Sequence, residues 1–161
     1  MNNSNDDTLR AHLIDLMVGG NAHATFDDAV ADLPANLRGS VPQGLPYSIW
    51  QLVDHIRIAQ WDILEFTKDQ EHQSPKWPDE YWPKEAEPEN EAAWNDALKQ
   101  IEADKEEFVG IISNPNNNLY QALPKGDGQS ILREALLIAD HLAYHTAEII
   151  VLRRLLGAWK K

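Results

Sequence analysis

The chain has no cysteine, few basic residues and no long apolar run, and each of these shortages narrows what it can do. Without cysteine there is no disulfide framework, no zinc site with thiolate ligands and no thiol nucleophile supplied by the protein itself. With 14 Lys and Arg against 26 Asp and Glu, the net charge is −12. Because nucleic acids and anionic membrane surfaces are bound through clustered Lys and Arg, we expect neither as a partner.

Two further shortages concern membranes and export. No stretch approaches the roughly 18–20 apolar residues that are needed to span a bilayer. Residues 1–7 are polar and acidic, unlike the basic and then apolar layout of a signal peptide. We therefore expect a cytoplasmic protein with residues 1–7 as a flexible N-terminal tail. The length of 161 residues suits a single domain over 1–161, with a core of its own.

The sequence does contain helical periodicity, and no segment alternates convincingly with the period of a strand. Four stretches have it, at about 8–33, 49–67, 89–112 and 131–156. Gly19 and Gly20 interrupt the first stretch, so we expect a kink or a break there. Ser48 and Gln51 form a capping box at the start of the second, and Ser130 is the expected N-cap of the fourth. These features predict an all-α fold, a four-helix bundle.

The connections between these stretches are long, and they cover residues 34–48, 68–88 and 113–130. Simple up-and-down bundles use short loops. A stretch of about 20 residues spans roughly 60 Å when extended, so one connection can cross the whole bundle and let two successive helices run parallel. Long loops in a compact domain also commonly supply the walls of binding sites.

Three histidines stand on the faces of two predicted helices. His141 and His145 are four residues apart, so they share one face, and His55 flanks the apolar seam of another helix. An unpaired buried imidazole costs on the order of 1–3 kcal/mol, so such residues need hydrogen-bond partners or a metal. Three protein nitrogens plus an open position are typical of a catalytic metal site. We interpret the three as ligands of one divalent ion; the alternative is core histidines that are bonded to neighbouring side chains.

Glu148 follows His145 by three residues and falls on the same helical face. The sequence leaves four roles open for it: a fourth ligand, an acceptor that orients a histidine, a base for water at the metal, or a residue of the solvated rim. The segment 77–83 brings three aromatic residues into the longest connection. For this segment we favour a crossover that is pinned to the bundle by its rings over a pocket wall.

Two stretches resemble the DinB-like superfamily of damage-inducible and YfiT-type metalloenzymes. The first is 44–56, in which Trp50 stands five residues before His55. The second is 140–149, which resembles the terminal His-x-x-x-His helix of the family and is followed by the sequence 152–157. The order of helices and the placement of loops are similar over nearly the whole chain.

The resemblance implies an up-down-down-up bundle in which His55, His141 and His145 hold a divalent metal ion at one end of a pocket. Imidazole ligands suit zinc, nickel and iron. Members with known activity include metal-dependent thiol transferases and a thiol-dependent isomerase, so the resemblance also implies a small-molecule substrate and a low-molecular-weight thiol. Homodimers are frequent in the family, and a homodimer is expected on that ground. In many members glutamine stands where this chain has Glu148.

The function that we expect is a metal-dependent enzyme of the thiol S-transferase or hydrolase type, which uses a metal-activated thiol or water. The alternative is a non-catalytic bundle that binds a metal or another ligand, as in a stress-related protein. Both require the same three histidines, and the sequence separates them poorly. Ligand exchange distinguishes them, because an open metal position binds azide or a thiol and a saturated one does not.

Overall fold

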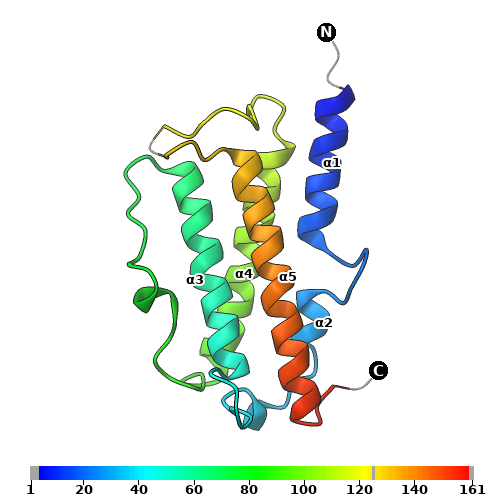
Figure 1. Cartoon of the computed structure of the whole chain (residues 1–161), viewed down its shortest axis with the longest axis vertical. Helices are drawn as coiled ribbons and strands as arrows, with labels where there is room; N and C mark the ends of the chain where they lie inside the picture. Colours follow the sequence, from blue (N-terminus) through cyan, green and yellow to red (C-terminus); the bar gives the residue numbers. More distant parts are fainter. Residues whose placement is uncertain (1–3, 125, 160–161) are drawn as a thin grey trace.

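The structure, a computed structural model, describes residues 4–124 and 126–159, and its regular elements are helices (Figure 1). The α-helices are α1 (Ser4–Val18), α2 (Phe26–Val30), α3 (Ile49–Lys68), α4 (Glu91–Ser113) and α5 (Ile131–Leu155). Single turns of 3-10 helix occur at Ala35–Leu37 and Asp79–Tyr81. The described residues contain no strand, only an isolated bridge between Ala122 and Ser130. The prediction of an all-α fold is confirmed.

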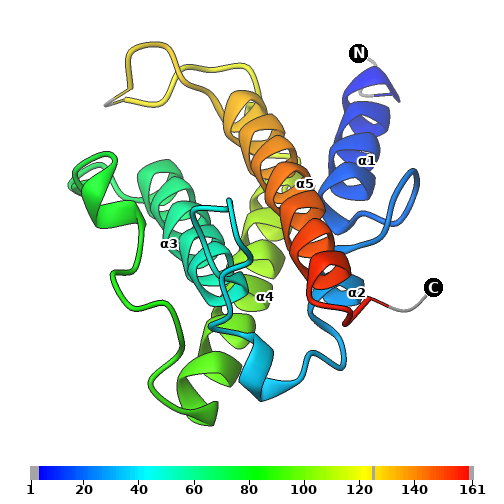
Figure 2. The ribbon, with the colours of Figure 1, turned by 60° about the horizontal axis from the view of Figure 1, so that its bottom comes forward.

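The long helices α1, α3, α4 and α5 lie side by side, as Figure 1 and Figure 2 show. α3 and α4 run in the same direction, and α1 and α5 run in the opposite one. Two consecutive parallel helices need a connection that returns along the bundle. The segment 69–90, which we call the crossover segment, makes this return along the outside of α3. The short helix α2 packs against α5 beyond the end of α1.

The first predicted helix is divided in the structure. α1 ends at Val18, and the chain resumes helical structure only at Phe26. Gly19 and Gly20 have φ angles of 81° and 85°, a left-handed conformation that side-chain-bearing residues rarely adopt, so the expected interruption is a full break. Thr25 then caps α2 by accepting a hydrogen bond from the Asp28 amide. The periodicity on both sides of the glycines belongs to two separate helices.

The prediction that residues 1–7 form a flexible tail is corrected for residues 4–7, which are the first turn of α1; residues 1–3 lie outside the described part. Acidic side chains near a helix N-terminus are favourable, and Asp6 accepts a hydrogen bond from Arg10 at 2.8 Å. The Arg10 guanidinium also donates to the carbonyl oxygens of Ile112 and Asn117. These bonds fix the start of α1 to the end of α4.

The apolar core forms two clusters, one toward each end of the bundle. The cluster at the N-terminal end of α3 includes Phe26, Leu52, Ile56, Trp94 and Ile149. The cluster at the C-terminal end of α3 includes Met17, Leu64, Phe108, Ile112 and Ile138. On α5, the buried members of one cluster end at Ala139 and those of the other begin at Ile149, so His141 and His145 lie between them. The histidines therefore interrupt the apolar packing between α3 and α5.

Helix α5 is, among the described residues, the one helix with the length and hydropathy of a membrane-crossing segment. Its sequence contains no continuous apolar run of that length, because Glu134, Asp140 and Glu148 interrupt the apolar residues. In the structure α5 packs against α1, α2, α3 and α4. These contacts make α5 the central helix of the bundle, and 39% of its most apolar stretch is buried.

Ser48 makes two hydrogen bonds with one hydroxyl group, and comparison with Ser130, which caps α5, measures the added contribution of the second bond. Its Oγ accepts the amide hydrogen bond of Gln51 at 3.1 Å as the N-cap of α3, and it donates to the carbonyl of Ala86 in the crossover segment. We expect Ser48→Ala to lower the free energy of unfolding by about 1–2 kcal/mol. The matched variant Ser130→Ala, which removes only the cap of α5, should cost about 1 kcal/mol. Urea denaturation measures both, and equal losses would contradict the added role of Ser48.

Candidate metal centre

Two helices bring the three predicted histidines together. His55 projects from α3, and His141 and His145 project from successive turns of α5. One ring nitrogen of each lies within 4.8 Å of the others, and the Nε2 atoms of His55 and His141 are 3.0 Å apart. The fractional exposure of the residue is only 1% for His55 and 7% for His145, and His141 is half-buried. The sequence prediction that these residues converge is therefore met by the geometry.

The outer ring nitrogens of two histidines are held by hydrogen bonds. Nδ1 of His55 lies 2.8 Å from the carbonyl oxygen of Tyr81, and Nδ1 of His145 lies 2.7 Å from Oε2 of Glu148. A carbonyl oxygen can only accept, so Nδ1 of His55 carries the proton and Nε2 keeps a free lone pair. The bond to the Glu148 carboxylate has the same effect on His145. The Nε2 atom of His55 faces that of His141, and a second ring nitrogen that donates to a protein acceptor is common among metal-binding histidines.

The crossover segment supplies groups that the sequence analysis did not assign to the site. The ring of Trp82 stacks on His55, with centroids 3.9 Å apart and planes 4° from parallel. The preceding residue, Tyr81, donates its hydroxyl hydrogen bond to Asp62 on α3, which also pairs with His72 at 2.7 Å. Asp62 thereby anchors the segment whose backbone carbonyl orients His55. Nothing in the local sequence pattern reveals this contact, because it joins residues 26 positions apart.

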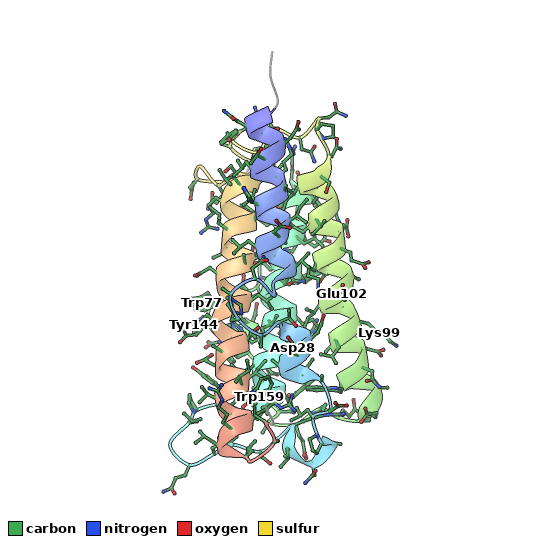
Figure 3. The ribbon with its side chains drawn as sticks, turned by 90° about the vertical axis from the view of Figure 1, so that its right-hand side faces the viewer. Asp28, Trp77, Lys99, Glu102, Tyr144 and Trp159 are labelled. Atoms are coloured by element: carbon green, nitrogen blue, oxygen red, sulfur yellow. The ribbon has the colours of Figure 1, made fainter. Side chains whose placement is uncertain are left out.

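A cavity of about 400 Å³ lies against the histidines. Its aromatic lining comes from three parts of the chain and consists of Tyr47, Trp77, Trp82 and Tyr144. Figure 3 shows Trp77 and Tyr144 at one level of the bundle, on the side of α5 away from Lys99 of α4. The segment 77–83 therefore combines the two roles that the sequence left as alternatives: it crosses the bundle, and its tryptophans form part of a pocket wall.

Burial keeps the histidines neutral. Desolvation is the main cause that lowers the pKa of His141 to about 3 and that of His145 to about 4, and nearby histidines lower both further. Desolvation also lowers the pKa of His55, against the hydrogen bond to Tyr81 and the negative charge of Glu148. A metal ligand must be the neutral imidazole, so at neutral pH no proton has to leave these rings before an ion binds.

The donor set fits a divalent cation. Two nitrogens bound to one zinc ion at tetrahedral angles lie about 3.3 Å apart. The Nε2 atoms of His55 and His141 are 3.0 Å apart, and the three ligand atoms all lie within 4.8 Å of one another. Imidazole suits zinc, nickel and iron. The ligand atoms that converge belong to the histidines, whereas Glu148 contacts the outer nitrogen of His145. Two buried histidines and the half-buried His141, beside a cavity, could therefore hold a metal ion with a position left for another molecule.

Comparison with known proteins agrees with this geometry. A family model described as the DinB superfamily matches residues 21–149, a range that includes all three histidines and Glu148. The chain belongs to the DinB superfamily. The resemblance noted in the sequence is thus confirmed, and it covers α2 to most of α5. No curated protein and no solved structure matches the chain.

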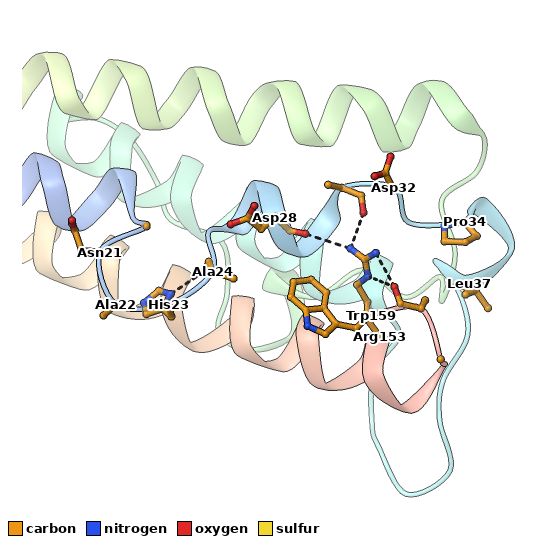
Figure 4. A pocket seen from close by; sticks show the side chains of 14 residues that line it. Asn21, Ala22, His23, Ala24, Asp28, Asp32, Pro34, Leu37, Arg153 and Trp159 are labelled. Carbon is orange, nitrogen blue, oxygen red and sulfur yellow. Dashed lines mark hydrogen bonds between the residues drawn. The ribbon is translucent and has the colours of Figure 1, made fainter. Parts of the chain in front are cut away.

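A larger cavity of this DinB-superfamily protein, of about 1040 Å³, lies between the α1–α2 connection and the end of α5 (Figure 4). Arg153 lines it and donates to the carbonyl oxygens of Ala29 and Ala31 at 2.7 and 2.8 Å and to that of Ala158. The Trp159 ring lies against the guanidinium, 5.1 Å from it. These bonds satisfy carbonyl groups at the end of α2. The arginine there serves the fold, and the histidine cavity is the better candidate site.

The lowered histidine pKa values predict how the metal-free protein responds to acid. Between the ordinary pKa of 6.5 and the folded values of about 4 and about 3, the unfolded chain binds more protons at His145 and His141 than the folded chain. The free energy of unfolding should therefore fall as pH falls through this window, by about 1.4 kcal/mol per pH unit for each proton. Urea unfolding of the metal-free protein from pH 8 to pH 4 measures this slope.

The control for this prediction is the double variant His141→Gln/His145→Gln. It keeps polar side chains at both positions and removes the two groups that titrate, while every carboxylate stays in place. Its unfolding free energy should depend less steeply on pH than that of the native chain between pH 6.5 and pH 4. Identical slopes in the two proteins would show that the imidazoles are not held neutral by the fold.

Proposed function

We propose that the protein is a divalent-metal-dependent enzyme of the thiol S-transferase or hydrolase type, with His55, His141 and His145 as the ligands. The observation that carries this proposal is the convergence of three histidine ring nitrogens within 4.8 Å of one another beside a cavity. Membership of the DinB superfamily supports it. When bound, a divalent ion with an open position lowers the pKa of a thiol or water held there and so supplies a nucleophile near neutral pH.

The residues around the three histidines orient the imidazole rings and line the space in which a substrate would bind. The Tyr81 carbonyl and the Glu148 carboxylate accept hydrogen bonds from Nδ1 of His55 and His145, which leaves Nε2 of each ring unprotonated and able to bind a metal. Trp82 covers one face of His55 and excludes water from it. Because the chain has no cysteine, the thiol in a transfer reaction must arrive as the substrate or as a low-molecular-weight co-substrate. The cavity lined by Trp77 and Tyr144 is where such a molecule would bind.

Glu148 acts in this proposal as an orienting acceptor. Its carboxylate lies 2.7 Å from Nδ1 of His145 and is not among the three converging ligand atoms. Burial raises the pKa of Glu148, and a hydrogen bond from Tyr144 opposes this shift. Outer acceptors of this kind fix the tautomer and the direction of a metal-binding ring, and their loss typically lowers metal affinity about 10–100-fold.

Two variants at position 148 test this role. Glu148→Ala should lower zinc affinity about 10–100-fold, because His145 loses its acceptor. Glu148→Gln keeps a carbonyl oxygen that can accept the same hydrogen bond, so its affinity should stay close to that of the native chain. Competition with a chelating dye measures both affinities. An equally large loss in Glu148→Gln would indicate that the carboxylate itself is a ligand.

Elemental analysis of protein purified without a histidine tag tests the centre itself. We expect about one divalent ion per chain in the native protein and none in His145→Ala. The matched control is His12→Ala, since His12 is an exposed residue of α1 and its loss should leave the metal in place. Circular dichroism checks that the variants remain helical. A native chain that lacks metal and takes up no zinc, nickel or iron would overturn the proposal.

The cobalt-substituted protein distinguishes an enzyme from a non-catalytic metal-binding bundle. An open position should bind azide or a small thiol and change the visible spectrum of the cobalt ion. A spectrum that neither molecule alters would indicate a saturated site and would favour the non-catalytic alternative. Elemental analysis thus reports whether a metal is present, and the cobalt spectrum reports whether a small molecule can reach it.

A further inference from the structure

A further cavity, of about 370 Å³, lies beside the one that is lined by the histidines. We call it the second cavity. Its walls come from the segment 45–47 before α3, from Leu52 of α3, and from the face of α5 that carries Val151. Tyr47 and Tyr144 line both cavities. The two spaces therefore adjoin, with these tyrosines at their common boundary.

The boundary is built on the same rings that surround the metal centre. Tyr47 stacks on Trp82 at a centroid distance of 4.5 Å, and Trp82 in turn stacks on His55. Tyr144 packs edge-on against His145 at 5.0 Å. A molecule with one end at the histidines thus reaches the second cavity by passing these rings. The stacking also holds the boundary in place without any contribution from a ligand.

The residues that line the second cavity determine which kind of chemical group can bind there. Among the described residues that line the second cavity, Glu148 carries the only charge, and its carboxylate is already bonded to His145 and Tyr144. Apart from this carboxylate and the tyrosine hydroxyls, the lining is apolar. A charged or sugar-like group placed there would lose its hydration without compensation, whereas an alkyl or aryl group would gain by burial.

The size of the cavity suits a substituent of that kind. An apolar cavity of about 150 Å³ is already large enough to bind benzene. The second cavity is larger, at about 370 Å³. It is also partly open, since Val151 on its edge is 46% exposed and Tyr144 is 63% exposed. An apolar ligand would cover side chains that are now in contact with solvent.

We propose that the second cavity holds an uncharged alkyl or aryl group of the substrate, while the reacting end of the same molecule lies at the three histidines. This inference rests on the proposed function and adds the class of substrate: a small molecule with an apolar substituent next to the reacting group. Glu148 stands where the two parts meet, because it lines the apolar cavity and bonds His145. The specificity for the substituent resides in the segment 45–47 and in Val151.

Two chain-length series test the proposal. The first measures the affinity of the metal-free protein for primary alcohols from ethanol to octanol by ligand-observed NMR. The second measures the affinity of the cobalt-substituted protein for the matching alkanethiols, from the thiolate absorption band. In both series affinity should rise about fourfold per methylene until the cavity is filled. Affinity that does not change with chain length, in either series, would overturn the proposal.

Two exposed positions on α5 provide matched variants. Val151→Asp places a charge in the cavity and should abolish the dependence on chain length, whereas Leu155→Asp changes a residue that is outside the lining and should leave it intact. Val151→Trp fills the cavity and should shorten the longest chain that still gains affinity. If Val151→Asp, with helicity and melting temperature like those of Leu155→Asp, kept the native dependence, the cavity would not be the binding site.

The two series also separate this inference from the proposal on which it rests. Absence of metal binding would remove the proposed function, yet the alcohol series would still report whether the cavity takes apolar chains. Alcohols that bind with the expected dependence, together with thiols that reach the cobalt without it, would show that the two cavities do not serve one molecule. That outcome would overturn the inference and leave the metal centre standing.

Discussion

The hydrogen bond from Nδ1 of His55 to the carbonyl of Tyr81 connects the topology of the bundle to its candidate metal centre. Because α3 and α4 are consecutive and run in the same direction, the chain between them has to return along the bundle. That return places Tyr81 and Trp82 against α3, where Asp62 fixes the tyrosine hydroxyl. A bundle with short loops would have no chain at this position, and His55 would lack its acceptor. The crossover segment is therefore as much a part of the site as the helices are.

The second condition that shapes the site is that the histidine rings are buried in their neutral form. A buried imidazole is costly when its nitrogens find no partner, by about 1–3 kcal/mol. For His55 and His145 one nitrogen is satisfied by a protein acceptor, and the other keeps a lone pair that is available to a metal ion. The lowered pKa values of His141 and His145 show that the surroundings disfavour the protonated ring. The apolar clusters on either side hold α3 and α5 at the spacing that lets the three rings meet.

The features that could be predicted from the sequence are those that depend on residues close together in the chain, whereas contacts between distant residues could not be predicted. The boundaries of α3 and α5 are local features: Ser48 and Ser130 are the caps that the sequence indicates. Helical spacing likewise places His141 beside His145. The contact between Tyr81 and His55 depends instead on the path of the crossover segment, which has no period to read. The same limit explains why periodicity merged α1 with α2, since the left-handed glycines between them leave the spacing of apolar residues unchanged.

Glu148 illustrates how one side chain can belong to two environments. The sequence places it on the face of His145 but does not distinguish a ligand from an orienting group. In the structure its carboxylate is bonded to the outer nitrogen of His145, and the same residue lines the neighbouring apolar cavity. A carboxylate beside an apolar space is tolerated because its oxygens are engaged, which is also what makes it effective in holding His145. The orientation of the imidazole and the character of the adjoining cavity are therefore linked through a single residue, so a change at this position alters both.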